Sequence, residues 1–152
     1  MTKKYVIETQ NLTKNYNGLV AVDHVDLQVK NGEIFGYLGP NGAGKTTTIK
    51  MLLGLRKPTA GSILINGKSF SSHSVELRDT IGYLPERLAF YDYLTPVETL
   101  NFFCELKGAD KSIVRTLLRE IGLEKAADRK VGKFSSGMVQ LLGIAQAMIG
   151  NP

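Results

Sequence analysis

A glycine-rich run between residues 39 and 46 carries the clearest chemical signature of the chain. It reads Gly-Pro-Asn-Gly-Ala-Gly-Lys-Thr, which satisfies the phosphate-loop pattern of Gly, four arbitrary residues, Gly-Lys and a hydroxyl residue. In such a loop successive backbone N–H groups point inward, and the glycines let the backbone approach a phosphate closely. We expect Lys45 to reach the β- and γ-phosphates of a nucleotide and the Thr46 hydroxyl to bind Mg²⁺.

The segments on either side of this run fit the same interpretation. Residues 34–38 form a short apolar run, typical of a strand that is buried on both faces. After the loop, Ile49, Leu52 and Leu53 are spaced as one face of a helix. The expected nucleotide-binding residues are Gly39, Asn41, Gly42, Ala43, Gly44, Lys45, Thr46 and Thr47. The alternative is a glycine-rich turn before an ordinary helix.

Composition limits the class of protein without choosing a ligand. With 152 residues the chain has room for one domain, and 43% hydrophobic and 22% charged residues describe an ordinary globular chain. A net charge of +5 is compatible with nucleotide, nucleic acid or an anionic membrane surface. A loose group of basic residues, Lys125, Arg129, Lys130 and Lys133, is interpreted as a solvated face.

Cysteine usage and hydropathy indicate a reducing compartment. Cys104 is the only cysteine, so no internal disulfide can form. The N-terminus lacks the apolar core of a signal peptide, and no apolar run approaches the roughly 20 residues of a spanning helix. We therefore expect a cytoplasmic location, with any membrane contact made through another chain.

The periodicity of apolar residues predicts an α/β chain whose second half is helical. Strands are expected at residues 5–8, 25–29, 34–38, 62–65 and 81–84, and helices at 46–54, 74–80, 95–108, 110–121 and from about 135 onward. Thr95, Pro96 and Glu98 have the spacing of an N-cap, a proline at N1 and a glutamate at N3.

A second run, at residues 134–140, reads Phe-Ser-Ser-Gly-Met-Val-Gln. Its two serines and the first free N–H groups of the helix that follows make a second candidate anion site. Taken alone, a capped buried helix explains the run as well. The candidate binding residues are Ser135, Ser136, Gly137, Met138 and Gln140.

Together the two runs and their surroundings resemble the ATP-binding-cassette (ABC) ATPases over essentially the whole chain. Residues 134–140 match the Ser-x-Gly-Met-x-Gln form of the family signature that bacterial exporter-like (ABC-2 type) members often carry. Residues 81–86, Ile-Gly-Tyr-Leu-Pro-Glu, resemble the strand entering the Q-loop, and residues 94–100 resemble the start of the helical subdomain. The resemblance implies an α/β P-loop NTPase fold: a mixed sheet with an antiparallel part, a phosphate-loop βα unit and a helical subdomain, incomplete at the C-terminus.

The resemblance also implies a subdivision and roles for single residues. Residues 1–85 would form the nucleotide-binding core, 86–94 the Q-loop region, and 95–152 the helical subdomain with the signature helix. Tyr16 would stack on adenine, with a half-exposed loop aromatic as the alternative. Glu86 stands where most members have a Gln that contacts Mg²⁺ and the attacking water, with an exposed loop carboxylate as the alternative.

These roles make Lys45 and Glu86 the implied catalytic residues, and Thr46 and Glu86 the implied metal ligands. The implied cofactors are ATP and Mg²⁺. In the family two such domains face head to tail, so Ser135 and Gly137 of one copy would contact ATP held by the phosphate loop of the other.

Besides Glu86, the sequence departs from the family in three places. No Asp-Glu pair follows an apolar strand, as it does in the Walker B motif, and His24 and His73 both precede the Q-loop, so neither is the switch histidine. Both histidines are expected at the surface. Leu141 replaces the Arg that usually follows the signature Gln. Without the Walker B strand, residues 34–38 would have an open edge. We therefore expect a piece of a longer protein or a truncated, non-catalytic product.

Three classes of protein carry such a phosphate loop. A transporter subunit would work with a membrane-spanning partner and a second ABC ATPase domain, peripheral at the inner face of the cell membrane. A soluble ABC protein of translation or chromosome maintenance shares both motifs, but residues 86–134 show no sustained heptads of a coiled-coil insertion. An unrelated phosphate-loop enzyme leaves Tyr16 and the second motif unexplained. We expect no nucleic-acid partner.

Overall fold

The structure, a computed structural model, describes residues 5–152, with the side chains of residues 71–75 left outside the description. His73, expected at the surface, is among these. The chain consists of two compact units, Met1–Arg78 and Asp79–Pro152, and each is described by itself. The subdivision expected at residues 85 and 94 stays a prediction.

The first unit is built on a three-stranded antiparallel sheet of β1 (Tyr5–Tyr16), β2 (Leu19–Lys30) and β3 (Ala60–Ile65), in the order β2-β1-β3. Two residues, Asn17 and Gly18, connect β1 and β2, with φ angles of 50° and 98°. Positive φ at both positions matches the right-handed twist of a hairpin, and Asn and Gly adopt it most readily. The antiparallel part of the expected fold is therefore present.

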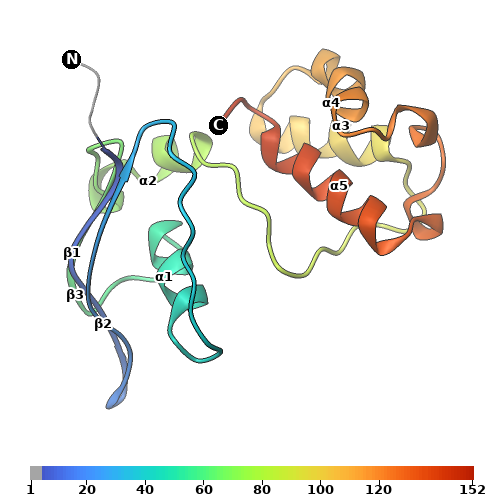
Figure 1. Cartoon of the computed structure of the whole chain (residues 1–152). Coiled ribbons are helices and arrows are strands. Elements are labelled where there is room, and N and C mark those ends of the chain that lie inside the picture. The colour runs from blue at the N-terminus through green and yellow to red at the C-terminus, as the bar shows by residue number, and fades with distance from the viewer. Residues whose placement is uncertain (1–4) are drawn as a thin grey trace. The chain divides into compact units, whose positions relative to one another are not determined.

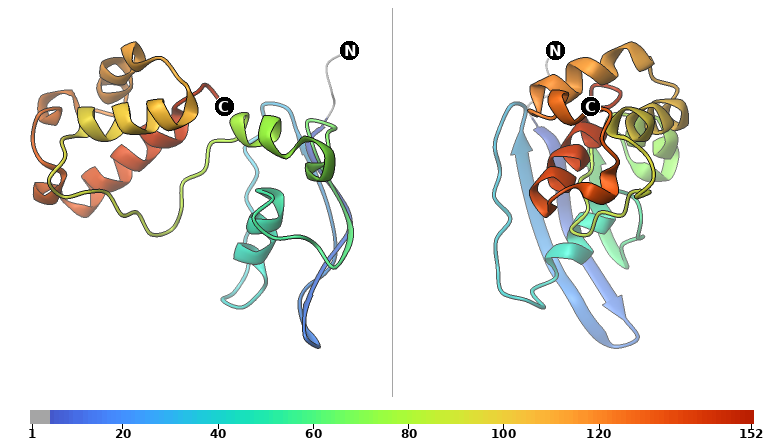
Figure 2. Two further views of the ribbon diagram at one scale, coloured as in Figure 1. Left: turned by 180° about the vertical axis from the view of Figure 1, so that it is seen from behind. Right: turned by 90° about the vertical axis from the view of Figure 1, so that its right-hand side faces the viewer.

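Helices α1 (Lys45–Leu52) and α2 (Phe70–Asp79) lie on the same face of this sheet (Figures 1 and 2). The helix α1 buries Thr48 and Met51, whereas Ile49 is 40% exposed. The expected apolar face at Ile49, Leu52 and Leu53 is thus wrong at its first position. Thr48 is buried instead, because its hydroxyl group donates a hydrogen bond to the carbonyl oxygen of Gly44 in the loop that leads into the helix.

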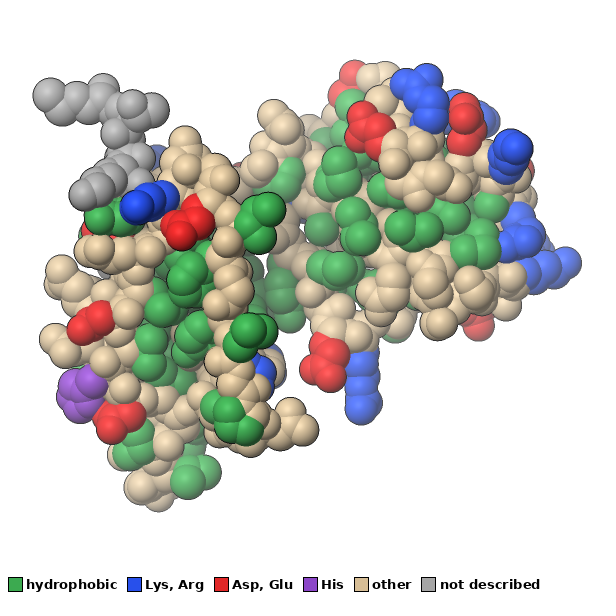
Figure 3. Space-filling view, viewed as in Figure 1, with side chains coloured by type: hydrophobic (Ala, Val, Ile, Leu, Met, Phe, Trp, Pro, Cys, Tyr) green, Lys and Arg blue, Asp and Glu red, His purple; other side chains and the backbone are tan. Residues whose placement is uncertain are grey.

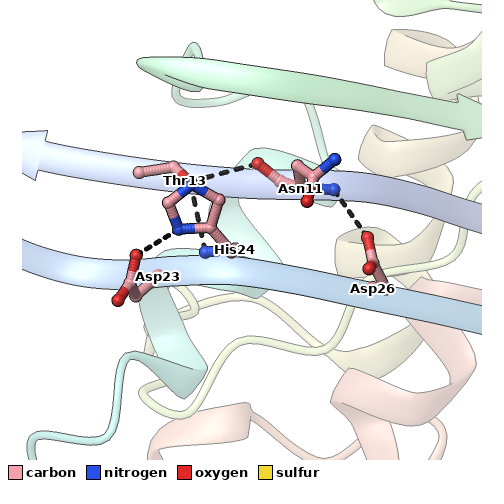
Figure 4. A network of polar contacts seen from close by, with 5 residues as sticks. All are labelled: Asn11, Thr13, Asp23, His24 and Asp26. Carbon is pink, nitrogen blue, oxygen red and sulfur yellow. Dashed lines mark hydrogen bonds and ion pairs between the residues drawn. The ribbon is translucent and has the colours of Figure 1, made fainter.

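A network of polar contacts joins β1 and β2 where their pairing is interrupted (Figure 4). The backbone N–H of Asn11 donates to Asp26 Oδ1 at 2.6 Å, and the N–H of His24 donates to Thr13 Oγ1 at 3.2 Å. Asn11 and His24 have φ angles of 48° and 44°. The side chains supply partners that the irregular ladder lacks. His24 is exposed, as expected, and its Nδ1 lies 2.5 Å from Asp23 Oδ1.

Two expected strands, residues 34–38 and 81–84, are not strands in the structure. Neither segment belongs to a helix or a strand, and a strand requires a neighbour that accepts and donates its backbone hydrogen bonds. Within residues 5–152 no strand lies beside either segment. Ile34 and Leu38 are consequently almost fully exposed, and hydrophobic side chains stand at the surface of this unit (Figure 3).

The second unit is helical. It contains α3 (Pro96–Lys107), α4 (Val114–Glu120) and α5 (Ser136–Met148), with short 3₁₀ turns at Lys111–Ile113, Glu124–Ala126 and Val131–Lys133. Its core consists of buried apolar side chains from all three helices, among them Leu100, Leu118 and Leu142. Burial in this core raises the pKa of the Cys104 thiol, which keeps it neutral.

The start of α3 is fixed by a capping box. The N–H of Glu98 donates to Thr95 Oγ1 at 3.2 Å, and the N–H of Thr95 donates to Glu98 Oε2 at 2.8 Å. These hydrogen bonds, the one from the Thr95 backbone first, lower the pKa of Glu98. Because the folded-state pKa is lowered, this contribution to stability is present near neutral pH and is lost as the pH falls through it.

Replacing Thr95 with alanine is expected to lower the free energy of unfolding by about 1 kcal/mol, since an orphan N–H of the first turn loses its acceptor. Urea denaturation followed by circular dichroism measures the change. The control Thr116→Ala removes an exposed threonine from the middle of α4 and should change stability by less than about 0.5 kcal/mol. Equal effects of the two variants would mean that the capping box contributes nothing to the free energy of unfolding.

Candidate functional site

The phosphate-loop run forms a turn that leads directly into α1. Gly42 and Gly44 have φ angles of 85° and 81°. Gly44 is the N-cap of α1, and no side chain caps this end of the helix. A left-handed residue followed by helical residues directs successive N–H groups to one side, where the helix dipole also favours an anion. The sequence-based expectation of a loop followed by a helix is therefore confirmed in its local geometry.

Gly44 also lies against the backbone of β2. A Cβ atom built on Gly44 would lie 2.2 Å from the carbonyl oxygen of Ala21 and 3.0 Å from Val22 Cγ2. Any larger residue would have to push the loop away from the sheet. Glycine is therefore required here both by its φ angle and by the close approach of two backbone segments.

The side chain of Lys45 turns back over the loop. Its Nζ donates to the carbonyl oxygens of Gly39 at 2.6 Å and Pro40 at 2.7 Å. These two bonds hold the ammonium group above the same turn whose N–H groups start α1. A single cation and several N–H donors are thus directed to one small region, which is the arrangement that a phosphate group requires.

Two residues that sequence reasoning missed, Thr48 and Tyr37, form hydrogen bonds beside the end of the loop. Thr48 is fully buried, and its Oγ1 donates to the carbonyl oxygen of Gly44 at 3.1 Å. The hydroxyl of Tyr37 lies 3.3 Å from the same Oγ1. A threonine four residues after the last glycine of the loop is the signal that could have identified Thr48, because its hydroxyl can reach back one turn.

The remaining loop residues are at the surface. Gly39, Asn41, Gly42, Ala43 and Thr46 are exposed, and Thr47 is half-buried. Their contacts to a nucleotide remain predictions, but exposure on one turn leaves their polar groups accessible. The first turn of α1 presents the Thr46 hydroxyl to solvent, as binding of a hydrated Mg²⁺ would require.

Tyr16 is the last residue of β1 and is 42% exposed. The Lys14 Nζ lies 5.0 Å from the centre of its ring and also donates to the carbonyl oxygen of Lys57 at 2.8 Å. The cation therefore restrains the ring at the end of the hairpin. A restrained, half-exposed ring is compatible with stacking on a purine as well as with a surface aromatic.

The second motif forms the start of α5, in the second unit. Ser135 is the N-cap, and its Oγ accepts a hydrogen bond from the N–H of Met138 at 3.3 Å. Ser136, Gly137 and Gln140 are exposed. This geometry is compatible with both interpretations of the run, a capped helix and an anion site, because a capped helix still presents its other N–H groups to solvent.

The α5 helix is held in place by apolar contacts. Leu142, Ala145 and Ile149 are buried, and Leu141 packs partly buried against the same core. Leu141, which replaces the usual Arg, thus anchors the helix through packing instead of through charge. Met148, the last residue of α5, is 39% exposed.

Glu86 is exposed in a bend of the segment between Asp79 and Thr95. It belongs to the second unit together with Ser135, while Lys45, Thr46 and Tyr16 belong to the first. The described residues contain no group of three or more His, Cys, Asp or Glu side chains suited to a metal ion. The assignment of Glu86 to a metal therefore rests on the resemblance alone, and that of Thr46 rests on the phosphate-loop pattern.

The ABC transporter family model matches residues 22–152, which include both motifs. The chain belongs to this family. The uncharacterized ABC transporter ATP-binding protein YcbN of Bacillus subtilis (strain 168) is 44% identical over 149 residues. The bacitracin transport ATP-binding protein BcrA of Bacillus licheniformis is 45% identical over 148 residues. Each comparison covers 97% of this chain and 48% of the relative, so the chain spans about half the length of the curated relatives it matches.

Solved structures confirm the fold class. An ATP-binding subunit of an ABC transporter superimposes with a TM-score of 0.80 at 33% identity, over 93% of this chain and 60% of that one. CbiO1 of Clostridium perfringens, part of the transporter complex CbiONQ, superimposes with a TM-score of 0.86 at 25% identity, over 99% and 63%. The expected P-loop NTPase fold of ABC type is therefore confirmed.

No helix in the described part of the chain is long and apolar enough to cross a membrane. Members of this family are ATPases, and ATP-binding subunits of ABC transporters work with membrane-spanning partners.

Proposed function

We propose that this chain is the ATP-binding part of an ABC transporter ATPase that binds MgATP at residues 39–47. The observation that carries the proposal is the convergence of the Lys45 ammonium group with the uncapped N-terminus of α1. ATP would be held by these N–H groups and by Lys45, with Tyr16 against the adenine and Thr46 at the magnesium ion. The residues present fit the ligand, since the turn offers several donors and one cation.

The second motif would act on the ATP of another copy. In a head-to-tail dimer Ser135 and Gly137 of one chain lie against the γ-phosphate on the phosphate loop of the other, together with Ser136, Met138 and Gln140. ATP then favours the closed dimer over the open one, because only the closed state places both sets of donors on the nucleotide. Hydrolysis in the complete protein removes that preference and reopens the dimer.

Glu86 and residues 86–94 would link this cycle to transport. They form an exposed segment between the two motifs, with Tyr91 and Tyr93 at its surface. We place the protein in the cytoplasm, at the inner face of the membrane through a spanning subunit. The helices between the motifs are short, 12 and 7 residues in α3 and α4, and so favour a transporter over a soluble ABC protein with a coiled-coil insertion.

The substitution Ser135→Arg tests the dimer. It places a long cation at the N-cap of α5, where the partner's phosphate loop would have to approach. In the full-length protein we expect ATP affinity within about twofold of wild type and loss of the ATP-dependent dimer. Equilibrium titration with ATP and analytical ultracentrifugation with and without ATP measure these two quantities.

The matched control is Thr116→Arg, which introduces the same side chain at an exposed position of α4. It should leave both ATP affinity and dimerisation unchanged. If Ser135→Arg dimerises with ATP as wild type does, the head-to-tail arrangement is wrong. If neither wild type nor the variants bind ATP, the proposed function itself is wrong.

A further inference from the structure

Arg129 contacts two residues of the second motif, Phe134 and Met138, which lie on either side of Ser135 to Gly137. Its guanidinium carbon Cζ lies 5.2 Å from the centre of the Phe134 ring, and its Nη2 donates to the sulfur atom of Met138 at 2.9 Å. Phe134 directly precedes the N-cap Ser135, and Met138 supplies the N–H that Ser135 caps. One side chain therefore spans the turn in which Ser135 to Gly137 are exposed.

Both contacts of Arg129 are made to side chains that are themselves anchored. Phe134 and Met138 are partly buried and pack against the core of the second unit. A guanidinium group is suited to this position, because its flat face stacks on a ring while its edge donates hydrogen bonds. A lysine could supply the charge, but it has neither the flat face nor the divergent donors.

The segment that carries Arg129 is also fixed by its backbone. The N–H of Val131 donates to the carbonyl oxygen of Leu94 at 2.8 Å, and the N–H of Gly132 donates to that of Asp92 at 3.0 Å. A Cβ atom on Gly132 would lie 2.9 Å from Asp92 Cβ, so the two segments are in close contact. Arg129 therefore reaches Phe134 and Met138 from a restrained position.

We propose that Arg129 is a positioning residue that holds the first turn of α5 in the conformation required to bind the γ-phosphate of ATP on another copy. This inference rests on the proposed function, since it concerns the same turn. Arg129 acts through Phe134 and Met138 and need not touch the nucleotide. Arg129 is exposed, in keeping with the solvated face expected from the sequence, and its contacts with Phe134 and Met138 come in addition.

The test compares Arg129→Ala, Arg129→Lys and the control Lys130→Ala in the full-length protein. Removing the stacked guanidinium should weaken ATP-dependent dimerisation and lower kcat for ATP hydrolysis by about fivefold. The affinity of the single chain for ATP should stay unchanged, because the phosphate loop lies in the other unit. Arg129→Lys should show the same loss, and Lys130→Ala, which removes a neighbouring exposed cation, should show none.

A double-mutant cycle with Phe134→Leu separates positioning from charge. If Arg129 acts through the ring, Arg129→Ala should cause little further loss of dimerisation in the Phe134→Leu background. Full dimerisation of Arg129→Lys, or additive losses in the cycle, would overturn the proposal in favour of a direct electrostatic effect.

The thermal midpoint of each variant provides a further check. If the loss of dimerisation in Arg129→Ala is fully explained by the fraction of protein that is unfolded, Arg129 contributes only to stability and the proposal is overturned. If Ser135→Arg also fails to affect dimerisation, the head-to-tail arrangement in the proposed function is wrong. If Ser135→Arg acts as expected and Arg129→Ala does not, only the role of Arg129 is wrong.

Discussion

Replacing Lys45 with alanine is expected to lower the affinity of the chain for MgATP by about a hundredfold, since hydrogen bonds to charged groups are each worth about 1.5–3 kcal/mol. The Nζ atom lies over the turn, held by the carbonyl oxygens of Gly39 and Pro40. It can exchange these acceptors for phosphate oxygens at little conformational cost. Isothermal titration calorimetry with MgATP measures the change.

The control for this experiment is Lys50→Ala. Lys50 is exposed on the same helix, so the variant has the same net charge as Lys45→Ala but keeps the loop intact. Its affinity for MgATP should stay within about twofold of wild type, because Lys50 lies about one and a half helical turns beyond Lys45 and its exposed charge is screened by salt. If Lys45→Ala binds MgATP as wild type does, in a folded state verified by circular dichroism, residues 39–47 are not the nucleotide site.

The second large effect is expected from Gly44→Ala. The new methyl group would lie 2.2 Å from the Ala21 carbonyl oxygen, at a φ angle of 81°. Backbone strain and overpacking each cost about 1–3 kcal/mol, so we expect a loss of about 3 kcal/mol in the stability of the first unit. Relief of the contact would displace the loop from β2, and affinity for MgATP should fall with it.

Gly32→Ala is the matched control. Gly32 has a φ angle of 75°, but a Cβ atom there would meet nothing within 4 Å. It isolates the cost of a positive φ angle, about 1 kcal/mol, from the cost of the close approach. Urea denaturation measures the free energy of unfolding of both variants, and amide hydrogen exchange in the sheet reports the stability of the first unit. Equal losses for Gly44→Ala and Gly32→Ala would show that the loop does not lie against β2.

Features that depend on a few neighbouring residues could be predicted from the sequence. The loop from Gly39 to Thr46 and the capping box of Thr95 and Glu98 have the local geometry expected of them. In each case the residue types that create the geometry lie within one or two turns of chain. Glycine supplies the positive φ angles of the loop, and a hydroxyl and a carboxylate supply the acceptors of the cap.

Features that depend on partners distant in sequence were predicted less well. Residues 34–38 have the composition of a buried strand, but composition does not provide the neighbouring strand that would complete its hydrogen bonds. Ile49 has helical spacing with Leu52 and Leu53, yet the helix buries Thr48 because its hydroxyl bonds Gly44. Arg129 is exposed, as the interpretation as a solvated face expects, but only the folded chain shows its contacts with Phe134 and Met138.

The sequence by itself determined the two candidate anion-binding runs, the family they resemble and the order of sheet and helices, because each depends on local residue types and spacing. The tertiary structure decided which side chains support those runs: Thr48 below Gly44, the Ala21 backbone beside it, and Arg129 across the start of α5. The physical reason is that a supporting contact requires two segments to be brought together. Local propensity carries no information on that approach, whereas packing and hydrogen bonding in the folded chain select it.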